Sequence, residues 1–155
     1  MPLIRLIFFA LILAFPMTGT FAQPKADTVW ASDCGDSFCV FRKPIAAPNS
    51  DGIFANIELL IDVADGTASV VITTPLGVAL TPGVRVLVGE TEWTAPLKVC
   101  QSDGCRASFT MNADDLAFLF QQSKMQLFYL PFGQTAPQSA SFNLAGLVSA
   151  ISKSN

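Results

Sequence analysis

The sequence has 155 residues, of which 51% are hydrophobic and 14% charged, and its formal net charge is -3 at pH 7. Its 9 basic residues are outnumbered by 12 acidic ones and form no cluster, which argues against a phosphate-neutralising nucleic-acid protein and against a basic patch for anionic lipid. Histidine is absent, so the commonest general base is missing. This length and apolar content predict one globular domain rather than a disordered chain.

The first 22 residues have the pattern of a secretory signal peptide. Arg5 precedes an unbroken apolar run at 6–15, and the small residues Thr20 and Ala22 mark a cleavage site after Ala22. The run is well short of the roughly 20 residues that a membrane-spanning helix needs. We therefore expect residues 23–155 to form a single periplasmic or secreted domain without a transmembrane segment.

Cysteines occur as two pairs with the same Cys-x4-Cys spacing, Cys34 with Cys39 and Cys100 with Cys105. An even number of cysteines in an exported chain favours two disulfides. Three connectivities are possible, and we favour the two local pairs, each closing a small loop over polar turn residues. Zinc binding and a redox-active dithiol are the alternatives, but the Cys-x2-Cys spacing typical of both is missing.

Several short β-strands are predicted by alternating apolar residues. The pattern at 57–63 and 68–72 flanks Asp65-Gly66, which is typical of a tight hairpin. Asp62 and Asp65 suggest a turn rather than a calcium site, because the alternating aspartates of a calcium loop are missing. Residues 46–52 read as a loop.

Further strands are expected in the second half of the chain. One carries Val84, Val86 and Val88, a second carries Trp93, Ala95, Leu97 and Val99, a third carries Ala107, Phe109 and Met111, and the apolar segment 125–132 reads as a buried strand. Together the short strands predict a mainly β domain, a compact antiparallel sandwich or barrel-like fold.

Two short helices complete the prediction. Asn112 is a suitable N-cap for a helix over 113–122, and Asp114 and Asp115 in its first turn favour the helix dipole rather than a catalytic pair. The C-terminal helix is expected from apolar residues at helical spacing, namely Leu144, Leu147, Val148 and Ile151.

Motifs that would indicate catalysis are missing from the sequence. It contains no Gly-x-Ser-x-Gly elbow, no Ser-x-x-Lys pair, no phosphate loop and no dinucleotide fingerprint. We therefore predict a protein that is not an enzyme and has no catalytic residue, cofactor or metal. Its partner, a protein or envelope component, is expected to bind loops.

The candidate partner-binding residues are Glu90, Glu92 and Trp93, an acidic rim beside an aromatic ring that suits a basic or polar partner. A solvated hairpin tip is the alternative for this segment, and core packing is the alternative for Trp93. The turn at 101–105 is expected at the opposite end of a strand around 95–99, and therefore on the opposite edge of the domain.

The order of several motifs resembles the invasion associated locus B family of exported bacterial proteins. Trp30 precedes the first cysteine pair, and "PLGVALTPGVRV" at 75–86, "VCQSDGCRA" at 99–107 and "FNLAGLVSAI" at 142–151 follow. The chain departs from the family pattern at Leu147, where a Phe is expected, and at Arg42, where Gln is usual.

The resemblance implies a compact β-rich domain in the envelope of a Gram-negative cell, with no established enzymatic activity or cofactor. We keep two alternatives to a partner-binding function. One is a carrier of a small apolar ligand, with its groove under the Phe-rich segment 118–132. The other is a thiol-dependent enzyme of unfamiliar type.

Overall fold

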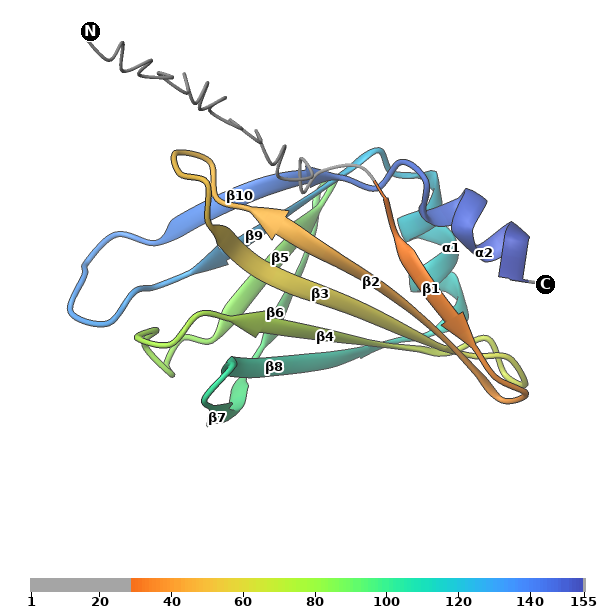
Figure 1. The fold of residues 1–155 in the computed structure, drawn as a ribbon, viewed down its shortest axis with the longest axis horizontal. Coiled ribbons are helices and arrows are strands. Elements are labelled where there is room, and N and C mark those ends of the chain that lie inside the picture. The colour runs from red at the N-terminus through yellow and green to blue at the C-terminus, as the bar shows by residue number, and fades with distance from the viewer. Residues whose placement is uncertain (1–28, 155) are drawn as a thin grey trace, which may run out of the picture.

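Two antiparallel sheets form the framework of the computed structural model, which describes residues 29–154 (Figure 1). The larger sheet has the order β1-β2-β3-β4-β8-β7, formed by Ala31–Cys34 (β1), Phe38–Ala46 (β2), Ile53–Asp62 (β3), Ala68–Thr74 (β4), Gly104–Met111 (β8) and Leu97–Gln101 (β7). The smaller has the order β10-β9-β5-β6, formed by Gln138–Asn143 (β10), Lys124–Tyr129 (β9), Val84–Val88 (β5) and Thr91–Ala95 (β6). The predicted mainly β sandwich is thus confirmed, and its two sheets do not close into a barrel.

The hairpin predicted around Asp65-Gly66 joins β3 to β4. Leu59 lies opposite Val70 and Ile57 opposite Ile72, and all four side chains are buried. The Asp65 carboxylate accepts hydrogen bonds from the backbone N–H and the hydroxyl of Thr67, at 2.8 and 2.6 Å. These bonds, the side-chain one first, lower the pKa of Asp65. This aspartate therefore holds the turn, as the turn interpretation expected.

Pro96 divides what the sequence presented as one strand. Ala95 ends β6 and lies opposite Val84 in the smaller sheet, whereas Leu97 begins β7 and lies opposite Ala107 in the larger sheet. The prediction that residues 93–99 form one strand is therefore wrong. Proline has no N–H for a ladder bond, so it suits the point where the chain leaves one sheet for the other.

The core lies between the two sheets. Val84, Val86 and Val88 of β5 are fully buried, as are alternate residues of β2, β3, β4 and β8 facing them. Successive residues of a strand point to opposite faces of its sheet, so the buried residues at alternate positions face the core together. At the bulge of β3, Phe54 and Ala55 are both buried. Along β9 the buried set is Met125, Leu127 and Tyr129.

Both helices lie at the end of the sandwich away from the long β9–β10 loop (Figure 1). Helix α1, Ala113–Gln121, begins with the predicted cap, since Asn112 and Asp115 form a reciprocal capping box. Helix α2, Leu147–Ser154, begins three residues later than the apolar spacing suggests. Gly146 before it has a φ of 86°, which is not helical. Leu144 is buried outside the helix, and Val148 is 54% exposed rather than part of the core face.

All four cysteines form the favoured local disulfides. Cys34–Cys39 joins β1 to β2, and Cys100–Cys105 joins β7 to β8, so each bridge staples a hairpin at one edge of the larger sheet. No cysteine is free, and residues 29–154 hold no group of three or more His, Cys, Asp or Glu side chains suited to a metal. Zinc binding by the four cysteines and free thiols are therefore wrong, while a redox-active cysteine pair stays an alternative.

The predicted signal peptide, residues 1–22, lies outside the described residues. Within the described range, no helix is long and apolar enough to cross a membrane.

Candidate functional site

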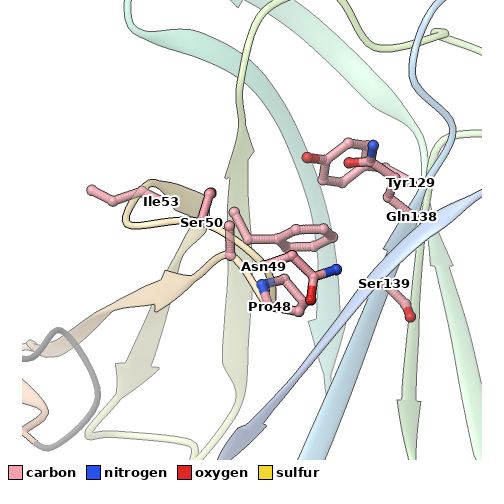
Figure 2. A pocket seen from close by; sticks show the side chains of 9 residues that line it. Pro48, Asn49, Ser50, Ile53, Tyr129, Gln138 and Ser139 are labelled. Carbon is pink, nitrogen blue, oxygen red and sulfur yellow. The ribbon is translucent and has the colours of Figure 1, made fainter.

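A groove separates β10 from the end of β2 and the loop that follows it. Two adjoining cavities form it, of about 390 and 470 Å³, and both are lined by Ala47, Pro48 and Ser139. In Figure 2, Pro48 and Asn49 lie on one side, while Gln138 and Ser139 of β10 lie on the other. The loop keeps its shape through a backbone hydrogen bond of 2.9 Å from Ala47 N–H to the Gly52 carbonyl.

The groove has an aromatic floor and an uncharged rim. The rings of Phe54 and Tyr129 pack at 4.6 Å between centroids and are only 3% and 8% exposed. Burial raises the pKa of the Tyr129 hydroxyl, so this group stays neutral at physiological pH. In the part of the chain that the structure describes, no lining residue of either cavity carries a charge; the set is Ile45, Ala46, Ala47, Pro48, Asn49, Ser50, Ile53, Phe54, Tyr129, Gln138, Ser139, Ser141 and Phe142.

Lys43 fixes one end of the groove. Its ammonium group donates a 2.9 Å hydrogen bond to the Asn143 carbonyl at the end of β10, and it lies about 6 Å from the rings of Trp30 and Phe142. The side chain is only 2% exposed. The edges of β2 and β10 therefore meet at Lys43 and Asn143, and the groove lies along β10 beyond this point.

The predicted partner-binding residues do not share one surface. Glu92 lies on the outer face of the smaller sheet, where it forms an exposed ion pair with Arg85 at 3.8 Å. Trp93 lies opposite buried Val86 and stacks on Phe109 of the larger sheet, at 5.9 Å between centroids. Trp93 is half-buried and closes the gap between the sheets. This agrees with the alternative prediction that Trp93 packs against the core.

Glu90 is exposed in the turn between β5 and β6. The neighbouring Gly89 lies against Phe118 and Gln122 at the C-terminal end of α1. The turn at 101–105 lies instead beside Thr74 at the end of β4. A binding role for Glu90, Glu92 and Trp93 stays a prediction.

Apart from Tyr129, which belongs to the groove, the Phe-rich segment 118–132 borders only small cavities among the described residues, one of about 200 Å³ beside Met125 and one beside Phe128. Phe118 and Phe120 pack against the core, and Arg85 lies 4.9 Å from the Phe128 ring. The cavity beside Phe128 has a volume of about 160 Å³, below the roughly 300–1,000 Å³ of typical small-molecule sites.

The residues that line the groove were not predicted from the sequence. Seven of the thirteen are isoleucine, alanine, phenylalanine or tyrosine, which read as core residues in the sequence. The other six are serine, asparagine, glutamine and proline, a composition that reads as ordinary turn chemistry. The one signal was the Pro48-Asn49-Ser50 cluster, which indicated a loop and no site.

The fold and groove define a class of protein: an antiparallel two-sheet sandwich with a local disulfide in each edge hairpin of its larger sheet and an uncharged groove along an edge strand. Within this class the chain belongs to the Invasion associated locus B (IalB) protein family, whose model matches residues 22–155. The resemblance seen in the sequence is thereby confirmed.

A solved structure has a similar fold. The crystal structure of invasion associated protein b from Bartonella henselae superposes with a TM-score of 0.67 at 19% sequence identity, over 80% of this chain and 89% of that one. At this identity the likeness supports the fold alone. No curated protein sequence matches the chain.

Proposed function

We propose that this chain is an exported, non-catalytic envelope protein that binds a partner in the groove between β10 and residues 45–50. The observation that carries the proposal is the groove itself, which is open, uncharged along its whole lining and built on an aromatic floor. Neutral polar rims around a buried apolar floor are common in binding sites. The partner is an envelope or host component.

Export is supported by the two disulfides, which persist in oxidising compartments, and by the signal-like residues 1–22. We expect cleavage after Ala22 and a mature chain that begins at Gln23. Intact-mass measurement of the periplasmic protein tests this, and a chain that retains residues 1–22 would refute it.

The absence of catalysis is supported by the described residues. The side-chain hydrogen bonds there serve turns, caps and strand pairs, and the four thiols are consumed in disulfides. Two hydroxyls in residues 29–154 do lie beside a possible base, Thr67 beside Asp65 and Ser108 beside Lys98, but the first bond holds the exposed β3–β4 turn and the second joins the exposed faces of β7 and β8.

Capture with crosslinking from the periplasm, followed by titration of the identified and purified partner, tests the binding function. Asn49→Arg with Gln138→Arg places two cations on the exposed rim, where we expect at least a tenfold loss of affinity and an unchanged melting temperature. Glu90→Lys with Glu92→Lys is the matched variant at the other candidate surface. If only this second variant weakens binding and changes its salt dependence, the docking surface is the 89–93 turn and the groove proposal is wrong.

A further inference from the structure

The outer edge of β10 exposes unpaired main-chain groups to the groove. Among residues 29–154, β10 pairs only with β9. Leu144 N–H donates to the Ser123 carbonyl at 2.9 Å, one step beyond the Asn143–Lys124 pair. Because bonded and non-bonded pairs alternate in an antiparallel ladder, residues 138, 140 and 142 bond to β9. The N–H and C=O groups of Ser139 and Ser141 then point away from β9.

The position of Lys43 supports this assignment independently. Asn143 belongs to the same set as Ser139 and Ser141, and its carbonyl accepts the hydrogen bond from Lys43. One outward group of the edge is therefore already occupied from the groove side. In residues 29–154, no hydrogen bond to the outward main-chain groups of Ser139 or Ser141 is found.

The edge of β10 also lacks the features that protect other edges. β7 carries Lys98 at a register shift, β6 carries Glu92 on its outer face, and β1 has only four residues. Pro44 stands where β2 extends past β1. Such charges, short strands and prolines discourage the addition of a strand. Residues 138–143, Gln-Ser-Ala-Ser-Phe-Asn, contain neither a charge nor a proline.

We propose that the groove binds an uncharged extended peptide segment of a partner protein, which adds to β10 as a further strand. This inference rests on the proposed binding function and names its ligand class. Four main-chain groups, those of Ser139 and Ser141, pair with the peptide backbone, and the small serine side chains allow its close approach. Strand addition of this kind takes its affinity from the backbone and its specificity from alternate side chains.

Size and chemistry favour a peptide over a sugar. The stretch from Gln138 to Asn143 spans about 17 Å, the length of a short strand. A sugar ring is commonly held on an open aromatic face, but the Phe54 and Tyr129 rings are buried against each other. Because no lining residue is charged, a charged segment would lose its hydration without gaining an ion pair.

Substitution of Ser141 separates the backbone from the side chain. Ser141→Pro removes the outward N–H and leaves the bonds of Ala140 and Phe142 to β9 intact, while Ser141→Ala removes only the hydroxyl. The probe is a displayed library of ten-residue peptides without charged residues, selected on the mature chain; the enriched peptides are then synthesised. We expect affinity to fall at least tenfold with Ser141→Pro and less than threefold with Ser141→Ala.

Amide hydrogen exchange gives a second readout. The Ser139 and Ser141 amides should exchange fast in the free chain and slowly with the peptide bound, whereas Ala140 and Phe142 are protected in both states. If Ser141→Pro does not fold, a series of selected peptides, each N-methylated at one position, takes the place of this variant. Because only alternate peptide residues would bond to β10, methylation should weaken binding at every second position.

Three results would overturn the inference: no enriched peptide, equal losses with Ser141→Pro and Ser141→Ala, or protection unchanged by peptide. A peptide-free dimer that Ser141→Pro abolishes would instead assign the edge to a second copy of this chain. Suppose the captured partner binds less tightly to the Asn49→Arg with Gln138→Arg variant although no peptide binds the groove. In that case the groove function stands and only the strand-addition inference is wrong.

Discussion

Gly104→Ala tests how closely the stapled β7–β8 hairpin approaches its neighbour β4. Gly104 directly precedes Cys105 and has a φ of 138°, a conformation that residues with side chains rarely adopt. A Cβ at this position would lie 2.2 Å from the Thr74 carbonyl oxygen and 2.9 Å from the Thr73 methyl group. The glycine in Cys-x3-Gly-Cys is therefore required by both its backbone angle and its contact.

The expected destabilisation has two parts. Holding a non-glycine residue in such a conformation costs about 1–3 kcal/mol. The clash involves backbone rather than a mobile side-chain end, so β4 and β8 must move apart, and overpacking of this kind costs about 1–3 kcal/mol. We expect the free energy of unfolding to fall by about 4 kcal/mol, a large part of the typical 5–15 kcal/mol.

Urea unfolding followed by the fluorescence of Trp30 and Trp93 measures this loss. Two other glycines serve as controls, because an added Cβ would meet no atom within 4 Å at either. Gly66 has a φ of 70°, so Gly66→Ala should lower the free energy of unfolding by about 1 kcal/mol. Gly35→Ala should change it by less than about 0.5 kcal/mol. If Gly104→Ala costs no more than Gly66→Ala, the close approach to Thr74 is wrong.

Three further predictions follow from contacts described above. Replacing Cys100 and Cys105 together by Ser should lower the free energy of unfolding by about 2 kcal/mol, measured in urea, and leave partner binding intact at low temperature; a folded variant that no longer binds would make the turn a site. Lys43→Ala should cost about 2–3 kcal/mol, because a buried side chain and its bond to β10 are lost, and an unchanged urea midpoint would contradict this. The pKa of Asp65, followed by NMR, should lie below 3.8 and rise toward it in Thr67→Val. Because the folded-state pKa is the lower one, the stabilisation is present above pH 3.8 and disappears as the pH falls through the folded value; equal Asp65 pKa values in the two proteins would refute the assignment.

Local chemistry made part of the fold predictable. Asp65-Gly66 lies between two alternating apolar stretches, and both the turn and the pairing of β3 with β4 follow from that pattern. The Asn112 cap was predicted and the local disulfides were the favoured of three connectivities, because each depends on residues within a few positions of one another.

Other elements depend on contacts that the sequence does not display. β10 contains Ser139, Ala140 and Ser141, which have low strand propensity, and it is a strand because β9 provides its ladder. Ala95 and Leu97 both contact the core although the chain changes sheet at Pro96, so the alternation gives no sign of the change; Val99, beyond a register shift, is 46% exposed. The groove arises where β10 and β2 diverge, so its residues are brought together only by tertiary structure.

The local disulfides have a consequence for oxidation during export. Within each bridge the two cysteines are five positions apart, so in an exported chain both would leave a translocation channel almost together. The native pairs form if Cys39 bonds to Cys34 as it emerges and Cys105 later bonds to Cys100. The two other connectivities require a partner more than 60 residues away along the chain. Disulfide reshuffling is slow, and pairing in this order would avoid it. In the exported protein proposed above, maturation needs a thiol oxidant but no isomerase.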